Sequence, residues 1–226
     1  KLAMGTTHVL IDLPYGENTK IERPDDLDFL GREFKELFAK VGIKCYTIKR
    51  QIKGPEGNGV GPALEIREAV RILEQTEDRS KSLEDTVVDM ATILLEQSGK
   101  AKKGQGEKLA RETLTTGKAL DKFWEIAVAQ GQEAPIKSED IKVGELTAEI
   151  KAHKSGKIMS INTRGMVDIA RALGTPKIKE AGIYLNKHVG DVVNEGDVIA
   201  TLYSVTDSRL NQGKEVSKVE ENWNIV

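Results

Sequence analysis

The chain has one cysteine in 226 residues, so it cannot form an internal disulfide. Aromatic residues make up only 4% of it, and no apolar run approaches the roughly 20 residues that a membrane-spanning helix needs. Acidic and basic residues nearly balance, and the net charge of −2 gives no general electrostatic reason to expect binding to nucleic acid or to an anionic membrane. We therefore expect a globular, cytoplasmic protein with neither kind of partner.

The sequence contains few cysteine and histidine residues, the side chains that most often act as nucleophiles or metal ligands. Cys45 lies in an alternating apolar and polar run, and we expect a small buried core residue rather than a nucleophile. The three histidines share no spacing, so they do not suggest a metal site. We expect His8 to be a structural residue at a strand edge, and His153 and His188 to lie at the surface.

The most informative stretch is residues 57–68, Gly-Asn-Gly-Val-Gly-Pro-Ala-Leu-Glu-Ile-Arg-Glu. Its three glycines tolerate positive φ and allow close approach to the backbone. Pro62 has the φ that a first helical residue needs. The following helix offers Glu65 and Glu68 within its first two turns. On these residues alone, a loop that receives a ligand and a turn that only packs a helix closely are both open.

The first part of the chain alternates between strand and helix patterns. Strands are expected at about residues 9–13 and 43–48, with a helix between them that begins at Pro24 and ends at Gly42. Together with the helix after the glycine loop, this order predicts a βαβα unit. The loop helix should bury one face, made of Ile66, Ala69, Val70 and Leu73. Two more helices are expected, at about residues 83–97 and 106–130.

From about residue 134 the pattern changes to short strands separated by glycine and polar turns. One helix, at about residues 166–173, interrupts the strands, and a last helix is expected around residues 214–222. The expected strands are at about residues 147–152, 156–161, 183–185, 192–193 and 198–203. The fold class is therefore α/β: a mixed α/β domain at residues 1–133, followed by a small β-rich (α+β) domain at residues 134–226.

Three segments together resemble one enzyme family. Residues 57–70 resemble the GxGxGPALEARE segment of the pyrimidine-nucleoside and AMP phosphorylases, and residues 1–16 resemble that family's KKxAxGxTHVLIDxPxG segment. Residues 181–197 are similar to its small terminal domain. The resemblance covers nearly the whole chain, and its archaeal branch is the most similar. It implies that the chain is a C-terminal fragment whose glycine-rich phosphate loop lies upstream, so we expect these 226 residues alone to be inactive.

The resemblance implies phosphorolysis of an N-glycosidic bond, with phosphate as co-substrate and no required cofactor. Because phosphate is the nucleophile, no catalytic acid, base or nucleophile is expected within the chain. AMP phosphorolysis would give free base and ribose 1,5-bisphosphate. A thymidine or pyrimidine-nucleoside phosphorylase, giving base and a (deoxy)ribose 1-phosphate, is the alternative. Either enzyme is expected to be a homo-oligomer, at least a dimer.

Lys20 is the expected substrate-binding residue. It follows an expected parallel strand, outside whose carboxyl end α/β proteins bind ligands. The resemblance matches it to a nucleotide-binding lysine in an archaeal PxGPTAK segment. Here Glu17, Asn18 and Thr19 replace Pro-Thr-Ala. A glutamate pointing inward there would repel a phosphate, which keeps a nucleoside substrate open.

Glu68 is the expected metal-site residue. The resemblance to bacterial pyrimidine-nucleoside phosphorylases implies a potassium ion held by Glu68 together with backbone carbonyls of Glu56 and Gly59. Oxygen ligands of this kind suit a hard cation. A glutamate favoured by the helix dipole is an equally good interpretation.

A biotinyl or lipoyl carrier domain is the weaker alternative. The sequence of residues 189–202 resembles a β-hairpin sequence of such domains, but a carrier needs a lysine at a tight hairpin. No such motif occurs, and Lys157 lies within an expected strand.

Overall fold

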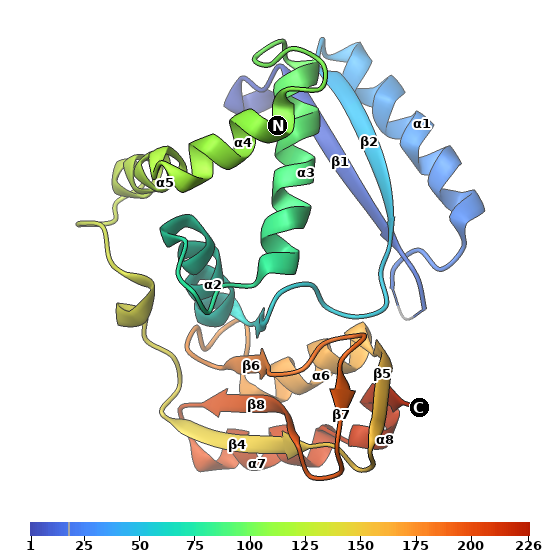
Figure 1. Cartoon of the computed structure of the whole chain (residues 1–226), viewed down its shortest axis with the longest axis vertical. Helices are drawn as coiled ribbons and strands as arrows, with labels where there is room; N and C mark the ends of the chain where they lie inside the picture. The colour runs from blue at the N-terminus through green and yellow to red at the C-terminus, as the bar shows by residue number, and fades with distance from the viewer. Residues whose placement is uncertain (18) are drawn as a thin grey trace. The chain divides into compact units, whose positions relative to one another are not determined.

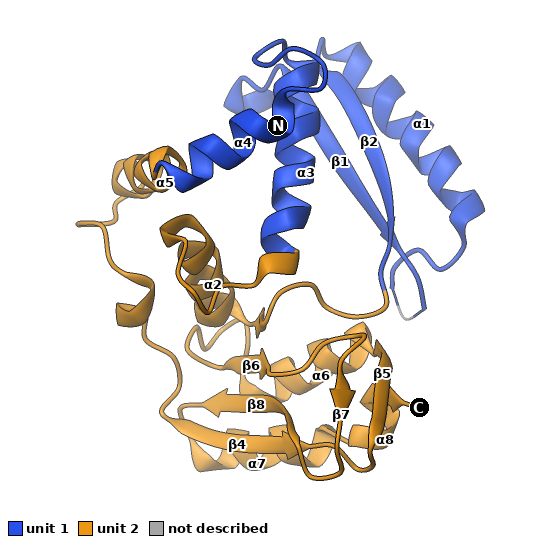
Figure 2. Ribbon diagram, viewed as in Figure 1, with its two compact units in different colours: residues 1–52, 83–116 blue, residues 53–82, 117–226 orange. Residues whose placement is uncertain are grey.

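The computed structural model describes residues 1–17 and 19–226. The chain forms two compact units, each made of two separate segments. Unit 1 comprises residues 1–52 and 83–116, and unit 2 comprises residues 53–82 and 117–226 (Figure 1 and Figure 2). In the part of the chain that the structure describes, no helix combines the length and apolar character needed to cross a membrane.

Unit 1 is built on one pair of parallel strands. Its elements are η1 (Leu2–Met4), β1 (His8–Tyr15), α1 (Pro24–Lys40), β2 (Lys44–Gln51), α3 (Lys81–Gln97, whose first two residues belong to unit 2) and α4 (Gly106–Thr115). β1 and β2 pair in unbroken register, from His8 opposite Lys44 to Tyr15 opposite Gln51. The expected parallel strands and the helix joining them are confirmed.

Helix α1 shows why the first predicted boundaries succeed. Pro24 is its first residue, and Asp25 and Asp26 lie in its first turn, where the helix dipole favours carboxylates. After the helix, Gly42 takes a φ of 74°, which suits glycine. The chain then turns directly into β2.

Unit 2 contains two antiparallel sheets. Their strand orders are β3-β6-β8-β4 and β7-β5-β9 (Figure 1). The strands are β3 (Gly59–Val60), β4 (Leu146–Lys151), β5 (Gly156–Ile161), β6 (Gly182–Leu185), β7 (Val192–Val193), β8 (Val198–Ser204) and β9 (Trp223–Ile225). The helices are α2 (Pro62–Glu74), α5 (Lys118–Ala129), η2 (Ser138–Asp140), α6 (Thr163–Leu173), α7 (Asp207–Val216) and α8 (Val219–Asn222). The β-rich character expected from residue 134 onward is confirmed.

One continuous apolar core holds the two sheets and α6 together. Ile183, Ile199 and Leu202 from β6 and β8 are fully buried in it. Helix α6 contributes Met166, Ile169, Ala170 and Leu173, whose spacing places them on one face. Trp223, from the last strand, is 1% exposed and also belongs to this core.

Three expectations about helices are wrong. The single helix expected at residues 106–130 is two helices, because Gly117 takes a φ of 78° and ends the run after α4. The helix expected at 214–222 is replaced by α7 and α8, and the strand β9 that follows was not predicted. On α2, Ile66 is 39% exposed. The buried residues of that helix are Ala63, Leu64, Glu68, Val70 and Ile72.

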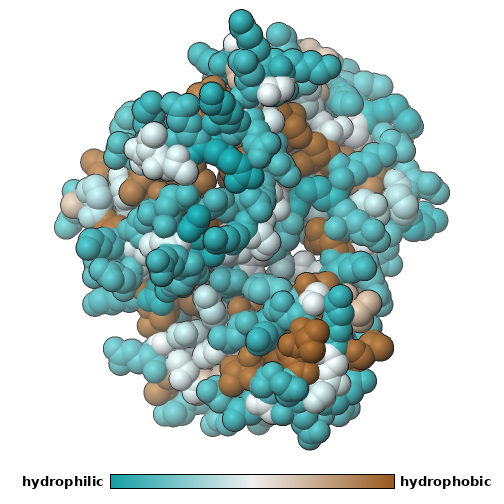
Figure 3. All heavy atoms as spheres, in the orientation of Figure 1, coloured by the Kyte–Doolittle hydropathy of each residue, from teal (hydrophilic) through white to brown (hydrophobic). Residues whose placement is uncertain are grey.

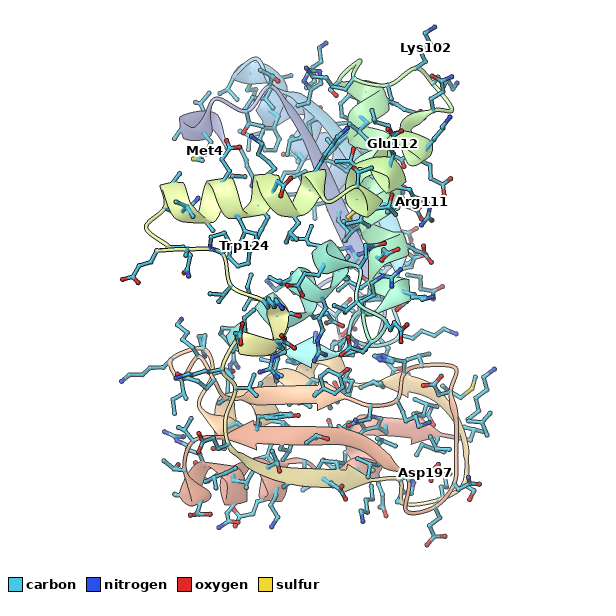
Figure 4. All side chains as sticks on the ribbon, turned by 60° about the vertical axis from the view of Figure 1, so that its left-hand side comes forward. Met4, Lys102, Arg111, Glu112, Trp124 and Asp197 are labelled. Carbon is cyan, nitrogen blue, oxygen red and sulfur yellow. The ribbon has the colours of Figure 1, made fainter. Side chains whose placement is uncertain are left out.

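Side-chain burial in unit 1 also departs from expectation. Leu37 of α1 and Val41 just after it are 60% and 43% exposed, although both side chains are apolar. Cys45 is half-buried rather than buried, and burial raises the pKa of its thiol. Arg111 of α4, labelled in Figure 4, forms an ion pair with Asp85 of α3 at 3.0 Å.

The division into units follows packing, whereas the predicted domain boundary follows the change of sequence pattern at about residue 134. Residues 134–226 all belong to unit 2, which also includes residues 53–82 and 117–133. The predicted boundary between residues 133 and 134 stays a prediction.

Candidate functional site

A buried carboxylate holds the glycine loop on helix α2. Glu68 is 4% exposed. Its Oε1 accepts the backbone N–H of Asn58 at 2.7 Å, while its Oε2 accepts the same N–H at 2.8 Å and that of Gly59 at 3.0 Å. A buried carboxylate is costly unless it is paired or hydrogen-bonded, and bonds to a charged acceptor are strong. Glu68 therefore anchors the loop.

At two of the loop glycines, the β-carbon of any other residue would collide with backbone atoms. A β-carbon on Gly59 would lie 2.7 Å from the backbone carbonyl of Leu64. Gly61 has a φ of 124°, and a β-carbon there would lie 2.6 Å from the carbonyl oxygen of Ala181. Glu65 completes the entry to α2, because its Oε1 accepts the N–H of Gly61 at 2.9 Å. The motif thus brings its backbone close to both α2 and the segment before β6.

The side chain of Asn58 joins this loop to residues distant in sequence. Its Nδ2 donates to the hydroxyl of Tyr184 at 3.1 Å, and its Oδ1 lies 2.7 Å from Nε2 of His188. A carbonyl oxygen only accepts, so Nε2 of His188 carries the hydrogen. His188 also donates its backbone N–H to Asp191 at 2.8 Å. Sequence reasoning missed this network, because no local spacing links Asn58 to Tyr184 or His188.

The expected surface positions of two histidines are wrong. His188 is half-buried and hydrogen-bonded, as described above. His153 is half-buried as well, and its Nδ1 is buried without a hydrogen-bond partner among the described residues. His8 lies in β1, half-buried, with its ring stacked 6.5 Å from that of Tyr46. That position agrees with the structural role expected for it.

The predicted potassium site is only partly assembled from the expected atoms. The structure brings Gly59 to Glu68, but through the glycine N–H rather than its carbonyl. Glu56 is exposed. A potassium ion would compete with the N–H groups of Asn58 and Gly59 for the Glu68 oxygens. The described residues include no cluster of three or more His, Cys, Asp or Glu side chains suited to a metal. The ion site stays a prediction, and the N–H contacts by themselves account for the burial of Glu68.

Lys20 lies in the loop after β1, at the carboxyl end of the parallel pair, and is exposed. Thr19 beside it is buried, with its hydroxyl 2.8 Å from the carbonyl of Gly16 and 2.7 Å from that of Ile21. The N–H of Gly16 donates to Ile21 at 3.1 Å, closing the loop. The loop backbone is therefore tied at Gly16, Thr19 and Ile21, while the ammonium of Lys20 faces solvent.

Two other residues of this loop were singled out in the sequence. Glu17 is exposed, whereas Asn18 lies outside the described residues. Lys20 belongs to unit 1, and Glu68 to unit 2.

Known proteins match this chain over almost its whole length. It is 39% identical over 219 residues to an enzyme of Methanocaldococcus jannaschii, and 37% identical over 220 residues to one of Archaeoglobus fulgidus. A protein of Methanococcus aeolicus is 39% identical over 211 residues. These relatives are AMP phosphorylases. The matches cover 97%, 97% and 93% of the chain, and the chain spans 43%, 43% and 42% of the relatives' length.

The AMP phosphorylase similarity is supported by a second match at the end of the chain. Residues 157–226 match the pyrimidine nucleoside phosphorylase C-terminal domain. This segment runs from β5 to the end of the chain and so includes most of the apolar core of unit 2. The resemblance stated from the sequence is confirmed by both findings.

The geometry of the hairpin between β7 and β8 bears on the carrier alternative. Its turn is Asn194-Glu195-Gly196-Asp197, with Asp197 accepting the N–H of Asn194 at 2.8 Å (Figure 4). The turn contains no lysine. Lys157 lies within β5, opposite Val192. A lysine presented at a tight hairpin, as a carrier requires, is not found in this turn.

Proposed function

We propose that the protein containing this chain catalyses phosphorolysis of AMP, giving adenine and ribose 1,5-bisphosphate. The observation that carries the proposal is the 37–39% identity to AMP phosphorylases over 93–97% of the chain. In this proposal, residues 1–133 form the last part of a phosphorylase domain, and residues 134–226 form its C-terminal domain. The enzyme is a cytoplasmic homo-oligomer, at least a dimer, that uses phosphate as co-substrate and requires no cofactor, apart from the potassium ion whose test is given below.

The reaction asks little covalent chemistry of the protein. A phosphate oxygen attacks C1′ of the ribose as the C1′–N bond breaks, and the departing base takes the bonding electrons and a proton. The transition state is oxocarbenium-like, as in glycoside cleavage. The protein must position phosphate, assist the departing base and exclude water. We assign no catalytic acid, base or nucleophile to this chain.

Lys20 has the chemistry to bind the 5′-phosphate of AMP. It is exposed at the carboxyl end of β1, on a loop whose backbone is tied by Thr19 and Gly16. An ammonium on a flexible stem makes charge-assisted hydrogen bonds to phosphate oxygens. Such a contact is worth about 1.5–3 kcal/mol, which corresponds to a roughly ten- to hundredfold change in kcat/KM.

The test compares a nucleotide with its nucleoside in a protein that supplies the preceding segment of an AMP phosphorylase. Lys20→Ala should lower kcat/KM for AMP by roughly ten- to hundredfold, and that for adenosine much less. Lys103→Ala, at another exposed lysine of unit 1, is the matched control and should change neither. Equal losses on AMP and adenosine would make Lys20 a loop-positioning residue.

A pyrimidine-nucleoside phosphorylase of the thymidine type is the second candidate, and the exposed Glu17 favours it. A carboxylate near Lys20 would weaken binding of a 5′-phosphate through like-charge repulsion. Phosphate-dependent release of base from thymidine or uridine, faster than from AMP, would establish this alternative. Glu17→Gln should then raise the activity on AMP.

The potassium proposal has its own test. If Glu68 helps to hold potassium, the activity of the unmodified enzyme depends on a monovalent cation, and Glu68→Gln weakens that dependence. Activity that is independent of the cation before and after the change rules the ion site out.

A further inference from the structure

Unit 2 contains a cavity of about 270 Å³ between helix α2 and strands β6 and β8. Helix α2 packs against β6 in this unit (Figure 1). Arg67 and Arg71 face the cavity from α2, one helical turn apart, and Tyr184 and Tyr203 face it from the strands. Two guanidinium groups and two phenol rings therefore line one small space.

Among the described residues, Arg67 forms no ion pair with a carboxylate. One of its terminal nitrogens donates to the carbonyl oxygen of Ile141, which is neutral. Its Nε is buried with no hydrogen-bond partner among the described residues. Burial lowers the pKa of this guanidinium, and the neighbouring charge of Arg71 lowers it further. Arginine nevertheless stays charged in proteins, so Arg67 carries a positive charge that no ion pair among the described residues meets.

Two carboxylates also line the cavity, but neither pairs with Arg67. Both oxygens of Glu68 already accept the N–H groups of Asn58 and Gly59. Asp78 lies 3.2 Å from Arg71, and its side chain is 59% exposed. Although Arg71 is half-buried, its partner is exposed to solvent, which weakens the pair and lets another anion displace Asp78. An incoming anion can therefore take the place of Asp78 on Arg71 while it neutralises Arg67.

We propose that this cavity binds a phosphoryl oxyanion, as inorganic phosphate or as the head of a phosphate monoester, between Arg67 and Arg71. The guanidinium fork matches phosphate oxygens in geometry and charge. The volume lies just below the usual range for ligand pockets, about 300–1,000 Å³, which suits a sugar phosphate better than a larger molecule. Tyr184 and Tyr203 flank the space left for the organic part.

The test follows the Nε–H resonance of Arg67 in ¹⁵N-labelled chain during titration with inorganic phosphate and, separately, with ribose 5-phosphate. The resonance should shift saturably with at least one of them. Tighter binding of the ester identifies a sugar phosphate as the ligand, and equal binding identifies the free anion. No saturable shift at about 10 mM, tenfold above a dissociation constant of 1 mM, overturns the proposal.

Variants separate this cavity from other sites. Arg67→Gln and Arg71→Gln should weaken binding at least about tenfold, which is about 1.4 kcal/mol. Asp78→Asn should strengthen it about threefold, because Arg71 is then released from its carboxylate. Arg209→Gln, at an exposed arginine of the same unit, and Lys20→Ala, at the proposed substrate lysine, should leave affinity unchanged.

The proposal can still be tested if one of these variants fails to fold. Circular dichroism checks the fold of Arg67→Gln, and if it is lost, the opposite effects expected of Arg71→Gln and Asp78→Asn decide. Binding that Lys20→Ala abolishes, or that neither Arg71→Gln nor Asp78→Asn alters, overturns the proposal. Because binding is read without turnover, these results are distinct from a failure of the proposed phosphorylase activity.

Discussion

The two units differ in how completely they bury their apolar side chains. Unit 2 has a continuous core in which Ile183, Ile199 and Leu202 are fully buried. Unit 1 buries few large residues and leaves Met4 80% and Phe29 59% exposed. Figure 4 shows Met4 at the edge of the ribbon, and Figure 3 shows apolar atoms among a mainly hydrophilic surface. Local stability rises with buried apolar contact, so we infer that unit 2 is the stabler of the two.

The same difference separates the two candidate sites. The glycine loop of unit 2 is held by a buried carboxylate and by the side chain of Asn58. The loop that carries Lys20 is tied mainly within itself, through Thr19. A loop held by its own contacts adjusts to a substrate more readily than one anchored to a core. We therefore expect Lys20 to move on binding and Asn58 to stay in place.

The largest effect should come from the core of unit 2. Leu202→Ala removes a fully buried side chain from β8 and should lower the free energy of unfolding by about 2–5 kcal/mol. Leu37→Ala is the matched change in unit 1, where the side chain is 60% exposed, and should cost less than about 0.5 kcal/mol. Urea denaturation of the two variants measures both. Equal losses would contradict the contrast in burial.

Replacing the loop anchor should have the next largest effect. Glu68→Gln leaves an amide group facing the N–H groups of Asn58 and Gly59, so a buried donor loses its acceptor. The expected loss is about 1–3 kcal/mol. Glu65→Gln, an exposed neighbour that accepts one N–H and can still do so through its amide oxygen, is the control and should lose much less. A negligible loss in Glu68→Gln would show that the loop does not depend on the carboxylate.

Hydrogen exchange tests the comparison without mutation. Amides of β8 in unit 2 should exchange at least about tenfold more slowly than those of β1 in unit 1, a difference of about 1.4 kcal/mol in opening free energy. Both strands are paired, so pairing alone does not distinguish them. Equal protection of β1 and β8 would mean that the units open together.

The smallest effect concerns Cys45 in unit 1. Burial raises the pKa of its thiol above the usual value of 9.0. The folded protein therefore keeps this proton at a pH where the unfolded chain has lost it, and the associated stability is present below pH 9 and falls as pH rises through the folded pKa. Cys45→Ala should remove that decline from the stability profile above pH 9. An unchanged profile would mean that the Cys45 thiol has the same pKa in the folded and the unfolded protein.

The sequence predicted elements well where one local signal was strong. Pro24 with its two acidic neighbours marked α1, and the alternating glycines and apolar pairs marked the strands of unit 2. The break at Gly117 was missed because an apolar pattern continues on both sides of it, and only its φ of 78° separates α4 from α5. The strand β9 was missed because Trp223 and Ile225 follow a helical pattern and pair with β5, a partner that lies far away in sequence.

The candidate site was predicted to a smaller extent. The motif identified Glu68 and Gly59 as neighbours, and the structure confirms that they meet. It could not show that Glu68 would be buried while Ile66 is exposed, because the burial of Glu68 depends on loop N–H groups whose position the sequence pattern does not give. Arg67 was not singled out at all, since its surroundings are made by residues distant in sequence, such as Ile141 and Tyr203.

The short strand β3 has a consequence for how this chain can be divided. Gly59 and Val60 pair with Tyr184 and Ile183 of β6, and so form one edge of the four-stranded sheet. A piece excised at residue 134 would lack β3 and leave β6 with an unpaired row of N–H and C=O groups beside buried apolar side chains. Such bare edges recruit strands from other molecules. The excised piece should therefore self-associate, and adding back a peptide of residues 53–82 should suppress it.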